Sequence, residues 1–350
     1  MNVRFKKYIL APSPLNITAL LVALLLFQFP KAFAQKTAAS DILAPNATVK
    51  QIFNGEEILE GPTMSPGGIL YFSDFPLSNG KPGKAGIIWS LDPLAGESKV
   101  FRSPSGMANG LLFDADGNLI ACEGADFGGR RVTKTDMKTG KSVIIAGLYQ
   151  GKPFNSPNDL AIDEKGRIYF TDPRYNGKEP VEQNLMGVYR IDTSGAVHLV
   201  AANVNKPNGI IVSPDQRTLY IANCDFPGNA SQWILPDGVP AVRPIPGGSV
   251  FAYDLMPDGS LQLKSRFIDY GSRCPDGMAI DMEGNLYVAM GDMLEIFSPQ
   301  GKKITEIKTP ARNVCFGRGK YSKTLFIAGG TGVYMIETKK EGYNVPFKNR

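Results

Sequence analysis

After the first 35 residues the chain consists of short apolar runs of strand length, separated by turns that contain glycine. In one representative unit, residues 158–163 are followed by a turn at Gly166 and by a second run, 167–172. Two such runs around a glycine-containing turn predict a β-hairpin. The same unit recurs at 111–123, 210–223 and 278–290. Because no long helical period follows the leader, the pattern predicts an all-β protein.

Each hairpin opens with an acidic or amide residue, and these openers recur along the chain. The six openers are Glu60, Asn109, Asn158, Asn208, Asp276 and Asn313. They are 49, 49, 50, 68 and 37 residues apart, by subtraction of those positions. A repeat of this size indicates a propeller or solenoid. Further strand runs between the hairpins, such as 187–192 and 249–254, give four strands per repeat. We therefore expect a six-bladed β-propeller with four-stranded antiparallel blades around a central metal site.

Two segments have expected places outside the regular repeat. Residues 48–53 are expected to pair with residues 332–337, so that the two ends of the chain close the ring. The 68-residue interval contains an insertion at 225–248 that is rich in Pro and Gly and carries Trp233. Long loops in compact domains are often functional, so we expect a lid over the site; a passive surface loop is the alternative.

The first 34 residues have the order of a secretory signal peptide. Basic residues precede an apolar run at 17–29, and a small-residue site follows at 32–34. The run of 13 residues is shorter than the roughly 20 that a membrane-spanning helix needs. We expect cleavage after Ala34, a secreted or periplasmic protein, and one propeller domain over 35–350. Retention of the leader as an anchor is the alternative.

The basic character of the chain belongs to this leader. The net charge of +5 falls to +1 without it, because its four basic residues are not balanced by any acid. The remaining chain has no basic run, so the electrostatic footprint of a nucleic-acid-binding protein is absent. We expect a small-molecule partner and no stable membrane insertion after cleavage.

In a closed ring the openers converge on one axis, where they would form an oxygen-rich cage. We expect four of them to hold one divalent cation, namely Glu60, Asn158, Asn208 and Asp276. Ca²⁺ is the first choice because it accepts many oxygen ligands in flexible geometry. Mg²⁺, Mn²⁺ and Zn²⁺ are the alternatives, zinc being disfavoured because no His or Cys cluster is present.

A cation with open positions polarises a carbonyl and acidifies water, which suits the hydrolysis of an ester or lactone. Asp276 is expected to carry out the proton transfer of the reaction. Asp172, at the end of its hairpin, is the second candidate for that role. Asn109 and Asn158 are expected to contact the substrate. The single histidine, His198, lies in a strand pattern remote from every opener and is expected to be structural, which argues against a Ser-His-Asp hydrolase.

The four cysteines, Cys122, Cys224, Cys274 and Cys315, match no zinc or redox spacing. One interpretation is that they are small buried residues near strand ends. The other is a bridge between Cys224 and Cys274, since both lie close to openers of neighbouring repeats.

Three stretches resemble the senescence marker protein (regucalcin), gluconolactonase and luciferin-regenerating enzyme family. They are 156–163 with 169–173, 206–210, and 274–281. The resemblance covers nearly the whole mature chain and implies a six-bladed propeller hydrolase. It implies a metal held by Glu60, Asn208 and Asp276, with Asn158 on or beside the metal and Asp276 as the base.

Two positions depart from that family. Ser156 stands where regucalcin carries a substrate-binding arginine, and Gly124 stands where many gluconolactonases have a histidine. The resemblance implies metal-dependent hydrolysis of a lactone, sugar-derived as in gluconolactonase, in a changed substrate pocket. The alternatives are a phosphotriesterase-like or aryl-ester hydrolase on the same metal, and a non-catalytic binding propeller that the metal stabilises.

Overall fold

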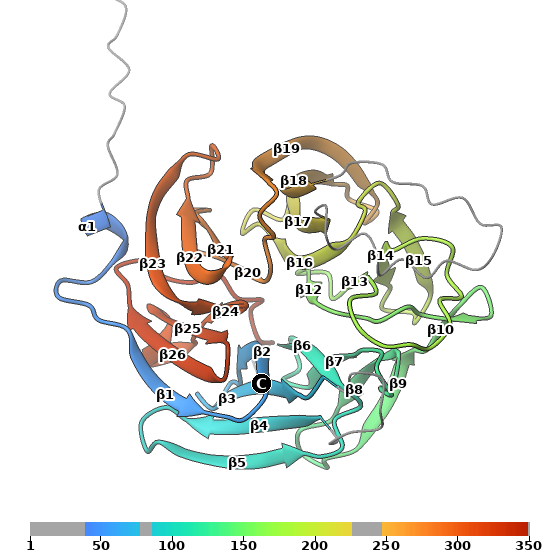
Figure 1. The fold of residues 1–350 in the computed structure, drawn as a ribbon, viewed down its shortest axis with the longest axis horizontal. Helices are drawn as coiled ribbons and strands as arrows, with labels where there is room; N and C mark the ends of the chain where they lie inside the picture. Colours follow the sequence, from blue (N-terminus) through green and yellow to red (C-terminus); the bar gives the residue numbers. More distant parts are fainter. Residues whose placement is uncertain (1–38, 78–85, 226–246, 349–350) are drawn as a thin grey trace, which may run out of the picture. The chain divides into compact units, whose positions relative to one another are not determined.

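The computed structural model describes residues 39–77, 86–225 and 247–348. This part of the chain contains six four-stranded antiparallel sheets, arranged as blades around one axis (Figure 1). In five blades the strands follow one another in sequence order from the axis outward. The prediction of an all-β, six-bladed propeller is confirmed.

The first three blades follow one another without exchange of strands. Blade 1 consists of β2 (Ile58–Met64), β3 (Leu70–Phe75), β4 (Ile87–Asp92) and β5 (Glu97–Arg102). Blade 2 consists of β6 (Ala108–Phe113), β7 (Leu119–Glu123), β8 (Arg131–Thr135) and β9 (Ser142–Ala146). Blade 3 consists of β12 (Leu160–Ile162), β13 (Ile168–Asp172), β14 (Gly187–Ile191) and β15 (Val197–Ala201).

The other three blades complete the ring. Blade 4 consists of β16 (Pro207–Val212), β17 (Thr218–Asp225), β18 (Gly247–Leu255) and β19 (Leu261–Gly271). Blade 5 consists of β20 (Met278–Ile280), β21 (Leu286–Ala289), β22 (Gly291–Phe297) and β23 (Lys303–Ala311). Blade 6 consists of β24 (Asn313–Phe316), β25 (Thr324–Gly329), β26 (Gly332–Glu337) and β1 (Lys50–Asn54). Minor elements are α1 (Ala39–Ile42), a ribbon of β10 (Leu148–Tyr149) and β11 (Lys152–Pro153), and a 3₁₀ helix at Gly319–Tyr321.

Blade 6 is closed by the two ends of the chain. Strand β1 pairs antiparallel with β26, with Lys50 opposite Met335 and Asn54 opposite Gly332. This confirms the predicted pairing of residues 48–53 with 332–337. The ring is therefore closed by backbone hydrogen bonds rather than by a covalent link.

Local side-chain hydrogen bonds stabilise the inner hairpin turns, as blade 3 shows. In blade 3, the Asp163 carboxylate accepts hydrogen bonds from the backbone N–H groups of Lys165 (3.0 Å) and Arg167 (2.9 Å). Gly166 takes a φ of 80° there, a conformation that glycine adopts without a steric penalty. Aspartate at a strand end followed by glycine thus specifies the tight turn that the sequence pattern predicted.

The core lies between neighbouring blades. Ile120 and Val132 of blade 2 pack with Phe170 and Tyr189 of blade 3 in one buried cluster. Full burial of a side chain of this size stabilises the fold by roughly 1.5–3 kcal/mol. Such clusters fix each blade against the next, and so fix the inner strand ends that carry the openers.

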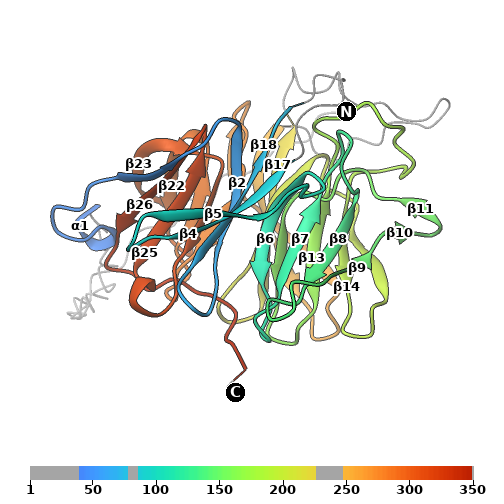
Figure 2. The same cartoon turned by 90° about the horizontal axis from the view of Figure 1, so that it is seen from below.

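The C-terminal segment crosses the lower face of the ring (Figure 2). Tyr343 donates its backbone N–H to Ile280 O at 2.9 Å, and Lys348 donates to Ala115 O at 2.8 Å. Tyr343, with the next two residues, lines one end of an axial cavity whose walls are the inner strands. The segment therefore covers the end of the axis opposite the openers.

Two predicted segments lie wholly or mostly outside the described residues: the leader, 1–34, and residues 226–246 of the insertion predicted at 225–248. The signal peptide and the lid remain predictions. Within the described ranges, no helix is long and apolar enough to cross a membrane.

Candidate active site

Hydrogen bonds between neighbouring blades hold the openers at the axis. Three of these bonds run from Ser73 Oγ to Asn109 O at 2.7 Å, from Gly110 N to Asn158 O at 2.8 Å, and from Thr171 Oγ1 to Asn208 O at 2.8 Å. Each bond uses the backbone carbonyl of an opener. These bonds therefore fix the backbone of the openers without using their side chains.

Glycine follows several openers because the blades meet there. A Cβ atom on Gly209 would overlap the carbonyl oxygen of Asp276 in the next blade, and one on Gly277 would overlap the Asn313 side chain. Only glycine permits this close approach. The Asn-Gly and Asp-Gly pairs are thus needed to bring the openers of adjacent blades together.

The two acidic openers share one site with Arg312. Burial raises the pKa of Glu60 well above its ordinary value, and the nearby Asp276 carboxylate raises it further. Burial also raises the pKa of Asp276, whereas Arg312 and a hydrogen bond from the Asn208 side chain oppose that rise. Two buried carboxylates in mutual repulsion favour a bound cation, which would neutralise both.

The donor set fits a hard cation only when the amides complete it. Among the described residues there is no group of three or more His, Cys, Asp or Glu side chains placed to hold a metal. Glu60 and Asp276 provide two charged oxygens, and Asn158 and Asn208 would provide neutral ones. An all-oxygen set of this kind suits Ca²⁺, and the lack of His and Cys disfavours Zn²⁺.

A pocket is lined by residues of blades 1 to 3, including two of the openers. Both predicted substrate contacts, Asn109 and Asn158, line it. The two positions that depart from the family, Gly124 and Ser156, line it as well. Its remaining walls are Phe75, Leu77, Met107, Ala125, Asp126, Pro157, Tyr175 and Asn176. The ligand and contact roles of the openers remain predictions.

Asp172 holds a loop of the pocket. Its two carboxylate oxygens accept backbone N–H bonds from Asn155 at 2.8 Å and from Ser156 at 2.7 Å. Burial raises the pKa of Asp172 to about 7, against the opposing effect of these bonds. The geometry gives Asp172 a positioning role for the segment that carries Asn158, and its predicted role in proton transfer is untested.

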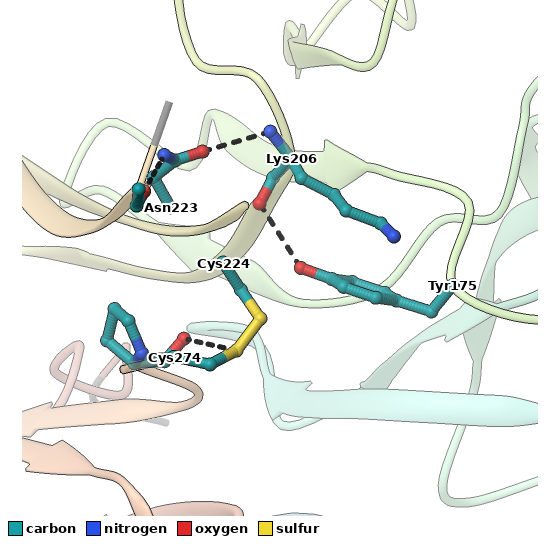
Figure 3. Close-up of a disulfide and its surroundings, with 7 residues drawn as sticks. Tyr175, Lys206, Asn223, Cys224 and Cys274 are labelled. Carbon is teal, nitrogen blue, oxygen red and sulfur yellow. Dashed lines mark hydrogen bonds between the residues drawn. A yellow bond between two sulfur atoms is a disulfide. The ribbon is translucent and has the colours of Figure 1, made fainter. Parts of the chain in front are cut away.

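The sequence did not single out Tyr175 and Lys206, which adjoin the site (Figure 3). The Tyr175 hydroxyl donates to Lys206 O at 3.1 Å, and the Lys206 ammonium lies 4.6 Å from the centroid of the Tyr175 ring. The Asn208 side chain also hydrogen-bonds to the Tyr175 phenol. Burial lowers the pKa of Lys206 to about 8. Tyr175 follows the hairpin of blade 3, outside the repeated unit, so the repeat carried no signal for it.

A disulfide links Cys224 and Cys274, with the two Cα atoms 4.6 Å apart. This confirms the bridge interpretation for that pair, whereas Cys122 and Cys315 are free thiols. Cys224 donates its N–H to Lys206 O at 3.0 Å, two residues before Asn208, and Cys274 lies two residues before Asp276. The disulfide therefore joins the backbone segments that precede two predicted ligands (Figure 3).

Two further singled-out residues, His198 and Asn313, are not members of the predicted cation set. His198 is on the outermost strand of blade 3, where it is 48% exposed and pairs with Asp192 at 3.0 Å. This position on the outer strand agrees with the expected structural role of His198. Asn313, which the sequence left without a role, directs its side chain across the axis to Asp159.

Comparison with known proteins gives consistent matches along the chain. Residues 59–228 and 245–331 match the family model described as SMP-30/Gluconolactonase/LRE-like region. The chain is 31% identical over 328 residues to the gluconolactonase of Zymomonas mobilis, covering 86% of this chain and 84% of the relative. It is 29% identical over 334 residues to the lactonohydrolase oryL of Aspergillus oryzae, covering 88% and 74%. The solved structure of a gluconolactonase from Xanthomonas campestris aligns with a TM-score of 0.70 and 26% identity, over 85% of this chain and 91% of that one.

Proposed function

Because this chain belongs to the SMP-30/gluconolactonase/LRE-like family, we propose that it hydrolyses a lactone with the help of one divalent cation. The observation that supports the proposal is the buried, mutually repelling pair of carboxylates of Glu60 and Asp276, together with a pocket that the openers Asn109 and Asn158 line. Paired buried carboxylates together with amides provide both a cation site and polar contacts for an uncharged substrate.

The proposed ligands are Glu60, Asn158, Asn208 and Asp276. When bound, the cation would polarise the lactone carbonyl and acidify an attacking water. Two carboxylates balance the charge of one divalent ion, and the oxygen set makes Ca²⁺ the first choice, with Mn²⁺, Mg²⁺ and Zn²⁺ as alternatives. The disulfide and the Tyr175 contact support Asn208 and Asp276 in place.

Asp276 is the proposed proton acceptor. Burial raises its pKa toward the range in which a carboxylate accepts a proton effectively near neutral pH. Asp172 is the second candidate. Asn109 and Asn158 are proposed to hold hydroxyl or ring oxygens of the substrate, since amides both donate and accept hydrogen bonds.

The proposed substrate class is a sugar-derived lactone. Two relatives that match most of the chain carry the names gluconolactonase and lactonohydrolase. The pocket has amide and hydroxyl groups at Asn109, Asn158 and Ser156, which suit a polyhydroxylated ring. We also propose that residues 1–34 direct export, because a disulfide persists in an oxidising compartment.

The decisive experiment measures lactone hydrolysis across a metal series after chelation, with glucono-δ-lactone as substrate. Activity should return with Ca²⁺, and Asp276→Asn should lose both cation affinity and turnover. Asp269→Asn, an exposed acid on β19 that pairs with Arg266, is the matched control. Wild-type affinity and turnover in Asp276→Asn would overturn the mechanism. Turnover of organophosphates or aryl esters instead of lactones would support the related hydrolase, and metal-dependent stability without turnover would support a binding propeller.

A further inference from the structure

The loop between β7 and β8 lines the pocket, and blade 3 holds its backbone on both sides of Asp126. Ala125 donates its N–H to Ser156 Oγ at 2.8 Å, and Phe127 donates its N–H to Glu179 Oε1 at 2.6 Å. Ser156 lies before β12, and Glu179 lies in the connection from β13 to β14. Asp126 is therefore fixed between two residues whose N–H groups are bonded to another blade.

The backbone of this loop is strained at the same place. Asp126 and Phe127 both have a φ of 67°. Aspartate tolerates this left-handed conformation, but it is unfavourable for a bulky residue such as phenylalanine. The Phe127 side chain is 58% exposed, so burial of its ring does not offset the strain. Strained residues persist where the surrounding structure fixes them, and they cluster at binding sites.

Glu179, which accepts one of the two bonds, is itself held in place. The buried Arg174 guanidinium donates to Glu179 O at 2.6 Å and to Asn155 O at 2.7 Å, and so ties Glu179 to the segment before β12. Gly177 has a φ of 92°, and a Cβ atom there would overlap both Asp126 N and the Glu179 carboxylate. The two loops can therefore approach each other only because glycine stands between them.

Asp126 brings a charge to the pocket wall. It is 6% exposed, and the other residues that line the described part of the pocket are uncharged. An ionised carboxylate accepts hydrogen bonds and donates none, and it forms short, charge-assisted bonds with hydroxyl groups. A site that bonds a substrate hydroxyl rejects an analogue without that hydroxyl, because its own polar group then loses a partner.

We propose that Asp126 is a specificity-determining residue that accepts hydrogen bonds from hydroxyl groups of a sugar-derived lactone, and that Glu179 positions it. The inference rests on the proposed lactone hydrolysis and names the contact that selects a hydroxylated ring. Asp126 is on the same wall as Gly124, which stands where many gluconolactonases have a histidine. A carboxylate two residues further along thus supplies a polar contact on that wall.

The test compares two lactones of the same ring size, glucono-δ-lactone and δ-valerolactone, which has no hydroxyl group. In Asp126→Ala, the KM for glucono-δ-lactone should rise about tenfold or more, by loss of a charge-assisted bond. The kcat/KM for δ-valerolactone should stay close to that of the wild type. Asp126→Asn should fall between, since it keeps one acceptor oxygen and tolerates the left-handed backbone. Asp136→Asn, in an exposed turn of the same blade, is the matched control.

Glu179 is tested by whether it acts through Asp126. Glu179→Ala should reproduce the selectivity change of Asp126→Ala, and the double variant should lose little more than either single variant. Glu179→Gln keeps an acceptor oxygen for the Phe127 N–H and should retain more of the wild-type selectivity. Equal losses for the two lactones in Glu179→Ala would overturn the positioning role, because a general disturbance of the pocket does not distinguish the substrates.

Thermal unfolding shows which variants are folded, and Asp126→Asn carries the comparison if Asp126→Ala is not. A wild-type KM for glucono-δ-lactone in the folded variants would overturn the inference while leaving lactone hydrolysis intact. So would equal losses for both lactones.

If the wild type hydrolyses no lactone with any metal, the proposed function fails, and a separate measurement then tests Asp126. Calorimetry with 1,5-anhydro-D-glucitol uses a hydroxylated ring without a bond to hydrolyse. Weaker binding to Asp126→Asn than to the wild type, both loaded with Ca²⁺, would support the contact. Equal binding, or no binding to the wild type, would overturn it.

Discussion

The Asn313 side chain in blade 6 donates a hydrogen bond to the Asp159 carboxylate in blade 3, with 3.4 Å between Nδ2 and Oδ2. The two residues are 154 positions apart in the sequence. Burial raises the pKa of Asp159 to about 7, and hydrogen bonds from Leu160 N and the Asn313 side chain oppose this rise. A direct bond across the axis thus ties opposite blades together next to the predicted cation site.

Replacing Asn313 with Ala should destabilise the protein by about 1–3 kcal/mol, because the buried Asp159 carboxyl loses a hydrogen-bond donor. Cation affinity should change little, since Asn313 is not a predicted ligand. Urea unfolding and Ca²⁺ calorimetry measure the two quantities. Asn118→Ala is the control, as Asn118 bonds Asp114 within a single turn. Equal losses of unfolding free energy in both variants would show that the cross-axis bond stabilises the protein no more than a bond within one turn.

Removing the disulfide should weaken cation binding as well as stability. In Cys224→Ser/Cys274→Ser the segments before Asn208 and Asp276 are no longer joined, and the unfolded chain gains freedom worth roughly 2–4 kcal/mol. We expect weaker Ca²⁺ affinity by calorimetry at a temperature where the variant is folded. Cys315→Ser, which alters a free thiol, is the control. Reduced stability with wild-type affinity would restrict the disulfide to a stabilising role.

Asp172→Asn should change how stability depends on pH. The folded-state pKa of Asp172 is raised to about 7, above the roughly 3.9 of an unfolded Asp. A group raised in this way contributes stability that is full below its unfolded pKa and is lost as pH rises through its folded pKa. The asparagine also offers one acceptor to two backbone N–H donors, which costs about 1–3 kcal/mol. The variant should therefore be less stable than wild type at pH 5, with a smaller gap at pH 8.

Urea unfolding at the two pH values measures this gap, with Asp136→Asn in an exposed turn as control. A gap that widens with pH contradicts the assigned shift. Steady-state kinetics of the same variant tests the predicted role of Asp172 in proton transfer. A large fall in kcat in folded protein with unchanged Ca²⁺ affinity would support Asp172 as a proton carrier.

The C-terminal segment should stabilise the ring from below. Tyr343 accepts a hydrogen bond from Gln216 Nε2 at 2.6 Å and donates one to Glu164 at 3.1 Å, which joins blades 4 and 3. Tyr343→Ala should lower the melting temperature more than Tyr343→Phe, because it also opens the axial cavity. Thermal unfolding measures both. Equal melting temperatures for Ala and Phe would show that the ring packing contributes nothing.

The repeat predicted the architecture because hairpin turns and strand ends are encoded locally. Asp163 and Gly166 illustrate this, since each turn is formed by residues within a few positions of one another. The pairing of residues 48–53 with 332–337 was predicted from the architecture, because a closed ring of blades requires the two ends of the chain to meet. The site residues Tyr175 and Arg312 were missed for a physical reason: they belong to segments between the repeated units and reach the axis only through packing.

The repeat also directed attention to Asn313 instead of its neighbour. Adjacent residues of an extended strand point to opposite sides. A shift of one position therefore turns a different side chain toward a given site. In blade 6 the opener Asn313 faces Asp159, whereas Arg312 acts on Glu60 and Asp276. Sequence alignment of repeats finds the equivalent position but does not determine which side chain reaches the site.

The pairing of β1 with β26 also sets an order of events during synthesis. Blades 1 to 5 can each form as soon as their own strands have been made, but blade 6 needs a strand from each end of the chain. A growing chain therefore holds an open ring until residue 337 has emerged. Blade 1, which carries Glu60, is joined to a complete blade 6 only at that moment. The cation site is thus expected to be the last part of the protein to mature, and any chain stopped before β26 should lack it.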